Sequence, residues 1–133
     1  MHKKTTTGAV FGAPMLGVQG ESLIYAHADQ MLEGYSGGVW HIVETDPGCG
    51  FMYPDADQLW RLIQPGNFFD REVDSLTAGA CLTVWVLGVL AYSFSDRGRA
   101  DLTRLTWERR ERLINWLERH EPEAARAVFA FID

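Results

Sequence analysis

The feature that most constrains this 133-residue chain is a run of nineteen residues without a charge, at positions 76–94. A helix of that length matches the hydrocarbon thickness of a bilayer, so the run either crosses a membrane or lies buried on all sides in a core. Gly79, Gly88 and Thr83 interrupt it, and the neighbouring segments predict strands that need an apolar cover. We therefore expect a buried central helix capped by Asp74 or Ser75, and no membrane partner.

Hydrophobic periodicity predicts three more helices around the central one. They are expected at residues 19–33, at residues 102–119 and from Pro122 onwards. Gly34 is placed to end the first, and a proline in the first turn suits the start of the last. The total is about four helices.

Stretches rich in β-branched and aromatic residues predict two hairpins. The expected strands are residues 39–44 and 51–53, joined at Asp46-Pro47-Gly48, and residues 59–63 and 68–73, joined at residues 64–67. The segment at 59–63 has an alternative as a short helix capped by Asp57. The fold class is α+β: a single domain, residues 11–133, in which a small, mainly antiparallel sheet packs against the helices. Residues 1–10 are expected to be a flexible N-terminus.

The charge of the chain is acidic and unevenly distributed. The formal net charge is −6, and residues 5–96 carry eleven Asp and Glu against only Arg61 and Arg71. Direct nucleic-acid binding needs a concentrated basic face, so none is expected. A domain roughly 35 Å across would have to replace roughly twenty phosphates to imitate duplex DNA. A complete DNA mimic is thereby disfavoured, although a local acidic patch suits a basic protein surface.

No pattern of residues supports a catalytic or metal centre. Residues 34–38 fit the letters G-x-S-x-G, but a nucleophilic Ser36 would need a strand before it and a helix after it, and here the order is reversed. His41 and Glu44 lie three apart on a strand and point to opposite faces. The alternative kept open is a small metal-assisted hydrolase using His27, His41 and nearby carboxylates. We expect no catalytic residues, no metal and no cofactor.

The two cysteines, Cys49 and Cys81, are too few for a disulfide framework. They fit a reducing compartment, although a single disulfide is left open. The basic start lacks the apolar run of a secretory signal, so the expected location is cytoplasmic.

Large aromatic residues concentrate in and beside the expected sheet. They are Tyr35, Trp40, Phe51, Tyr53, Trp60, Phe68 and Phe69. Most are expected in the core, because such side chains dominate the core of small domains. One that is exposed beside the acidic loops would suit a protein partner as an anchor.

Taken in order, several segments resemble the antirestriction proteins of the ArdB/KlcA type, over about residues 11–133. The matching residues are Gly20-Glu21 with Ile24-Tyr25-Ala26, Tyr35-Ser36-Gly37-Gly38-Val39-Trp40, Gly50-Phe51-Met52-Tyr53-Pro54, Gly66-Asn67-Phe68, Ala78-Gly79, Pro122-Glu123-Ala124 and Ile132-Asp133. Cys49 and Glu121 depart from the pattern.

The resemblance implies a non-catalytic protein of plasmids or other mobile genetic elements that evades a host defence, relieving type I restriction-modification of incoming DNA. Its expected partner is the host type I restriction machinery or an associated host protein, with a monomer favoured. From expected exposure and charge, the candidate contact residues are Ser36, Gly37, Gly38, Asp46, Asp55, Asp57 and Asp133.

Overall fold

The computed structural model describes residues 3–133, with residues 3 and 4 described by their backbone alone. In chain order the elements are β1 (Lys3–Lys4), α1 (Thr7–Phe11), α2 (Pro14–Met31), β2 (Trp40–Glu44), β3 (Gly50–Pro54), β4 (Leu59–Gln64), the 3-10 turn η1 (Pro65–Asn67), β5 (Phe69–Asp74), α3 (Ser75–Asp96), α4 (Ala100–His120) and α5 (Pro122–Ile132). The α+β class is confirmed, with five α-helices in this part of the chain.

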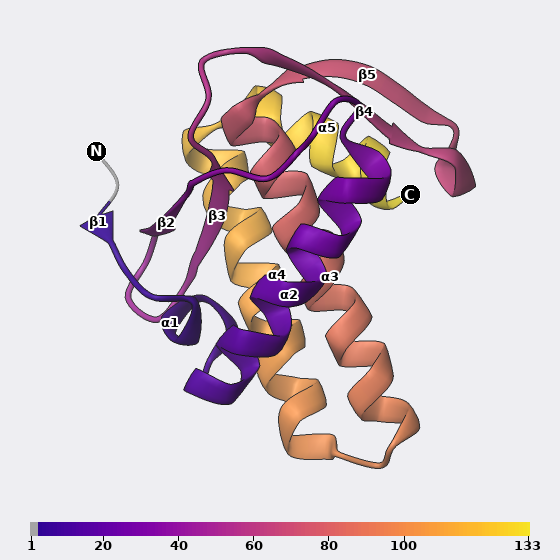
Figure 1. Ribbon diagram of the computed structural model, residues 1–133. Helices are drawn as coiled ribbons and strands as arrows, with labels where there is room; N and C mark the ends of the chain where they lie inside the picture. The colour runs from indigo at the N-terminus through magenta and orange to yellow at the C-terminus, as the bar shows by residue number, and fades with distance from the viewer. Residues whose placement is uncertain (1–2) are drawn as a thin grey trace.

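Helix α3 is the spine of the molecule. It packs against α2, α4, α5 and β3, and every residue from 78 to 84 is buried. Figure 1 shows α3 and α4 as a long antiparallel pair that α2 crosses. Among residues 3–133, α3 alone has the length and apolar composition of a membrane span. Its burial by the other elements is that of a core helix, as predicted.

The start of α3 and its contact with β3 follow from particular side chains. Asp74 caps the helix, because its Oδ1 accepts a hydrogen bond from Thr77 N at 2.8 Å. Thr83 Oγ1 lies 3.3 Å from Met52 N and 3.4 Å from Met52 O, which ties the buried helix to the strand. At Gly79 a Cβ would overlap the backbone of β3, so glycine permits the close approach.

Both predicted hairpins are present, but they belong to two separate antiparallel sheets rather than one. Strands β1, β2 and β3 form the first sheet, and β4 with β5 forms the second. Beyond β4, the chain that leaves α2 takes the place of a further strand: Leu32 bridges Leu62, and Glu33 N donates to Arg61 O at 3.0 Å. Since Leu59–Gln64 is a strand, the alternative helix capped by Asp57 is wrong.

The start of the chain differs from the expectation of a flexible segment at residues 1–10. Residues 1 and 2 lie outside the described part, but Lys3 pairs with Glu44 in the first sheet. Thr6 caps α1 by accepting a hydrogen bond from Ala9 N at 3.2 Å. Val10 and Phe11 at the end of α1 are buried. Residues 3–10 therefore contain a strand and most of a short helix that the sequence did not predict, because the polar run supplies a cap and strand pairing while two apolar residues join the core.

Helix α2 begins at Pro14 and not at Gln19, the predicted start. Proline is well suited to the first turn, where its missing N–H would have had no partner. The helices predicted at residues 102–119 and from Pro122 lie where expected.

Candidate partner-binding surface

The loop between α2 and β2 carries three of the predicted contact residues. Ser36, Gly37 and Gly38 are all exposed. Gly37 and Gly38 have φ values of 95° and 126°, a region that other residues rarely occupy. A Cβ at either position would meet nothing within 4 Å, so the backbone conformation, and not crowding, requires glycine there.

An aromatic cluster anchors this loop. The centre of the Trp40 ring lies 5.6 Å from that of Tyr25 and 6.0 Å from that of Tyr35. The centre of the Tyr35 ring also lies 6.2 Å from that of Trp60. Trp40 Nε1 donates to the Tyr35 hydroxyl at 3.1 Å, and the Tyr25 hydroxyl donates to Glu21 at 2.6 Å. Burial, reinforced by the Glu21 carboxylate, raises the pKa of Tyr25, which stays a neutral donor. Four residues that carry the resemblance thus hold the loop in place.

Asp55 lies beside the end of the loop, and Asp57 follows it two residues later in the chain. Asp55 N donates to Val39 O at 2.8 Å, which brings the end of β3 against the end of the loop. The Asp55 carboxylate lies 3.0 Å from His41 Nε2, and Asp57 follows in an exposed position. This surface is therefore acidic and polar, and an open hollow of about 560 Å³ separates the loop from Asp29 on α2.

Asp46 lies elsewhere, in the turn at the opposite end of the β2–β3 hairpin. Its Oδ2 is 3.5 Å from Arg119 Nη2, and the neighbouring Pro47 O accepts a hydrogen bond from Arg112 at 2.5 Å. Basic side chains of α4 therefore counter the charge of this turn.

Asp133 occupies a third place, at the end of α5. Burial lowers the pKa of the Arg110 guanidinium on α4, and the negative charge of Asp133 acts in the opposite direction. The seven predicted contact residues thus divide into the loop group, the Asp46 turn and the C-terminal Asp133. Their role in binding remains a prediction.

Other residues that carry the resemblance lie in the core or join elements of the fold. Phe51 is buried with its ring 6.2 Å from that of Trp116, and Pro54 is also buried. Asn67 Nδ2 donates to Phe131 O at 2.5 Å, which joins the β4–β5 turn to α5.

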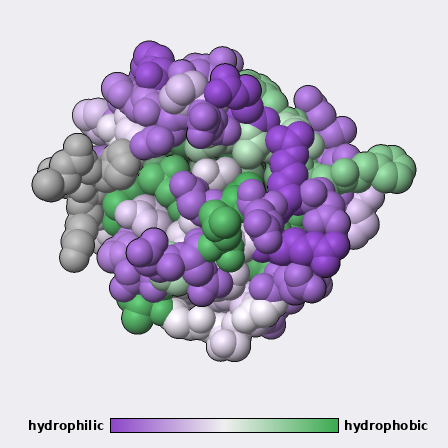
Figure 2. All heavy atoms as spheres, turned by 90° about the horizontal axis from the view of Figure 1, so that it is seen from above, coloured by the Kyte–Doolittle hydropathy of each residue, from purple (hydrophilic) through white to green (hydrophobic). Residues whose placement is uncertain are grey.

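Phe68 is the exception among the aromatic residues of the sheets. The others are buried or partly buried, but the Phe68 side chain is 97% exposed and its φ of 55° is unusual for a residue with a side chain. Figure 2 shows an apolar side chain projecting from the right edge of a mostly hydrophilic face, on the side where the β4–β5 tip lies in Figure 1. An exposed aromatic ring of this kind suits an anchor in a protein contact.

The residues considered for catalysis do not converge. Ser36 follows a helix and precedes a strand, unlike the serine of a hydrolase elbow. His27 Nδ1 lies 2.7 Å from Leu23 O in its own helix, and His41 contacts Asp55 alone among carboxylates. Within residues 3–133 no three His, Cys, Asp or Glu side chains gather as metal ligands would. The metal-assisted hydrolase therefore finds no candidate ligand set in this part of the chain.

The family model described as "Antirestriction protein" matches residues 33–133. The Escherichia coli (strain K12) protein named "Putative antirestriction protein YubI" is 36% identical over 113 residues, which span 85% of this chain and 78% of that protein. An Escherichia coli antirestriction protein KlcA is 32% identical over 88 residues, or 66% of this chain and 62% of KlcA.

A solved structure is also similar. It comes from the KlcA and ArdB proteins, which are described as having a novel fold and antirestriction activity against type I DNA restriction systems in vivo but not in vitro. The similarity covers 92% of this chain and 83% of that one, with a TM-score of 0.77 and 29% identity. The two small sheets around a long buried helix are thus the KlcA/ArdB fold. Together with the family match over residues 33–133, this shows that the chain belongs to the antirestriction protein family.

Proposed function

We propose that this protein relieves type I restriction of incoming plasmid or phage DNA in the cytoplasm, by binding a host protein and without catalysing a reaction. The observation that carries the proposal is the similarity to the KlcA and ArdB structure over 92% of the chain. Those proteins act on type I systems in vivo but not in vitro. Such a difference is expected when a component that only the cell supplies takes part, and this favours an associated host protein as the partner.

The surface chemistry supports binding of a protein in preference to DNA. The loop group combines an exposed glycine loop with Asp55 and Asp57, and like charge would repel a phosphate backbone. Exposed carboxylates beside a polar hollow suit a basic patch on a partner. The aromatic cluster under the loop would limit the ordering cost of binding, because the loop is already anchored at Tyr35 and Trp40.

The test is a plating assay. Unmodified phage is plated on a host that carries a type I system, with and without the expressed protein, and modified phage serves as the control for general effects on infection. We expect the protein to raise the plating efficiency of unmodified phage alone. Equal plating with and without the protein would refute the proposal.

A matched pair of double variants then tests the loop group. Asp55→Asn with Asp57→Asn removes two charges of the loop group. Asp96→Asn with Asp101→Asn removes two charges at the far end of the α3–α4 pair, where both residues are exposed. We expect the first pair to reduce relief of restriction and the second to leave it unchanged. Equal relief by both would exclude these carboxylates from the contact.

A further inference from the structure

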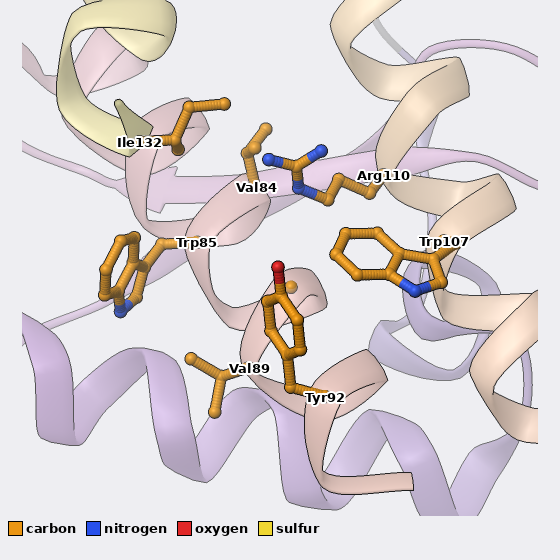
Figure 3. A pocket seen from close by; sticks show the side chains of 8 residues that line it. Val84, Trp85, Val89, Tyr92, Trp107, Arg110 and Ile132 are labelled. Carbon is orange, nitrogen blue, oxygen red and sulfur yellow. The ribbon is translucent and has the colours of Figure 1, made fainter. Parts of the chain in front are cut away.

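An apolar groove lies on a different face, between α3 and α4 and below the end of α5. Its deep part is a cavity of about 190 Å³. Figure 3 shows Trp85 and Trp107 on opposite sides of Tyr92, whose hydroxyl points into the space below Arg110. We call this the α3–α4 groove, defined by Trp85, Val89, Tyr92, Trp107 and Arg110.

The groove is lined by three aromatic residues, of which Tyr92 is exposed and the two tryptophans are partly buried. Tyr92 is 67% exposed and packs edge-on against Trp107, with ring centroids 5.3 Å apart and an interplanar angle of 84°. Arg110 Cζ lies 5.2 Å from the centre of the Trp107 ring. These contacts order the side chains before anything binds, and ordered aromatic and arginine residues are the usual anchors of protein interfaces.

The single charge that lines the deep part has no ion-pair partner within residues 5–133. Arg61 and Arg119 lie within ion-pair distance of carboxylates, whereas no carboxylate lies that close to Arg110. Burial lowers the pKa of Arg110, and the fields of Asp133 and Glu111 offset that effect only from a distance. A half-buried guanidinium of this kind is stabilised by a carboxylate that a ligand brings to it.

The groove has a deep part and an open part. The deep part has room for about one large side chain, and the open part beside it measures about 490 Å³. The groove continues past Trp107 and Arg110 into this more open depression, which reaches Ile114 and Phe129. Glu111 and Glu118 also line the depression, so Arg110 is the only cation among the described residues that line the groove. An elongated groove with one deep pocket fits a polypeptide segment that inserts a single anchor.

We propose that the α3–α4 groove binds a segment of a partner protein that carries a large apolar side chain next to a carboxylate. The apolar side chain fills the cavity between the two tryptophans. The carboxylate accepts hydrogen bonds from the Arg110 guanidinium and the Tyr92 hydroxyl. The proposal rests on the proposed function in one respect: it assigns a contact surface to the partner through which restriction is relieved.

The first test titrates the full-length protein with acetyl-Gly-Phe-Glu-Gly-amide and follows the indole N–H signals of Trp85 and Trp107 by NMR. Two further peptides, with Gln for Glu or Ala for Phe, remove the charge or the anchor. We expect saturable shifts of both indole signals with the first peptide and at least about tenfold weaker binding of the other two, because a hydrogen-bonded charge or a buried ring is lost. Equal affinity for all three peptides, or no shift at either tryptophan, would overturn the proposal.

Arg110→Met keeps the apolar stem of the side chain and removes the charge. Its matched control is Arg104→Met on the same helix, an exposed position outside the groove. We expect Arg110→Met alone to weaken the first peptide at least about tenfold and to reduce relief of restriction in the plating assay. Thermal unfolding of both variants checks that they fold. A folded Arg110→Met protein with wild-type binding and relief would contradict the proposal.

Failure of the two proposals would look different. If the wild-type protein does not change plating, the proposed function fails, and the peptide titration still decides on the groove. If wild-type relief survives in Arg110→Met, the groove proposal fails and the proposed function stands. If sedimentation shows a wild-type dimer that Arg110→Met abolishes, a second copy of this chain occupies the groove and the assignment to a partner protein is wrong.

Discussion

The contact between α3 and β3 predicts opposite effects for two glycine-to-alanine changes in one helix. A Cβ at Gly79 would overlap the Met52 carbonyl oxygen and the Cα of Tyr53, and these backbone atoms move only if the strand moves. A Cβ at Gly88 would meet the flexible Arg110 side chain at 3.5 Å, an ordinary contact. Both changes gain the same helix propensity, about 0.5–1 kcal/mol.

The magnitudes follow from this difference. Overpacking usually costs about 1–3 kcal/mol, and the rigid backbone on the far side of Gly79 places its cost near the upper limit. After the propensity gain, Gly79→Ala should lower the free energy of unfolding by about 2 kcal/mol, or lower Tm by about 7 °C for a chain of this length. Gly88→Ala should raise it by about 0.5–1 kcal/mol.

Urea unfolding followed by circular dichroism and by tryptophan fluorescence measures both values. The two probes should give coincident transitions, and the dependence on urea should match that of the wild type, so that the midpoints report stability alone. If Gly79→Ala proves as stable as Gly88→Ala, then α3 and β3 do not approach closely at Gly79, and glycine is not required there.

Three further predictions concern stability and titration. Asp74→Ala removes the hydrogen bond to Thr77 N that caps α3 and should cost about 1 kcal/mol in the same urea titration, so an unchanged midpoint would count against the cap. Hydrogen bonds from Arg61 hold the pKa of Asp70 below its ordinary value, so this pair stabilises the fold above the unfolded pKa and loses that effect as pH falls through the folded pKa. Arg61→Met should return the pKa of Asp70 to its usual range in an NMR titration, and an unmoved pKa would exclude this cause. Burial raises the pKa of the Cys81 thiol, so a thiol reagent should modify it only on unfolding, and rapid labelling of the native protein would contradict its burial.

Elements governed by local chemistry could be predicted from the sequence. The turn Asp46-Pro47-Gly48 joins β2 and β3, and Pro122 begins α5 as expected. Turn and cap residues act within a few positions, so their effect is readable without knowledge of the rest of the fold. The length of α3 could also be predicted from the sequence, because an uncharged run of that length forms either a membrane span or a buried core helix.

Features that depend on distant partners could not be predicted in this way. The polar start of the chain forms a strand because Lys3 pairs with Glu44 of β2. It forms a helix because Phe11 packs into the core against Gly20 of α2. One expected sheet became two because Leu32 occupies the edge of β4. Each outcome depends on which segment arrives beside another, and local propensity contains no such information.

The candidate surfaces also combine features that the sequence predicts with features that depend on tertiary contacts. The pair of Glu21 and Tyr25, four apart on a helix, was readable from spacing. Their assembly with Tyr35 and Trp40 under the glycine loop was not. The groove was missed because α3 is apolar around its whole circumference, so that its pattern does not distinguish Trp85 facing the groove from neighbours in the core.

The sequence by itself determined the α+β class, the central buried helix, the hairpin turns and, through its resemblance, the family. The tertiary structure alone decided the separation into two sheets, the division of the predicted contact residues among three places, and the groove around Arg110. The physical reason is the separation along the chain over which each kind of interaction acts. Caps, turns and helical periodicity act between residues close in the chain, whereas burial and charge pairing depend on which surfaces meet, and those are fixed only when the whole chain packs.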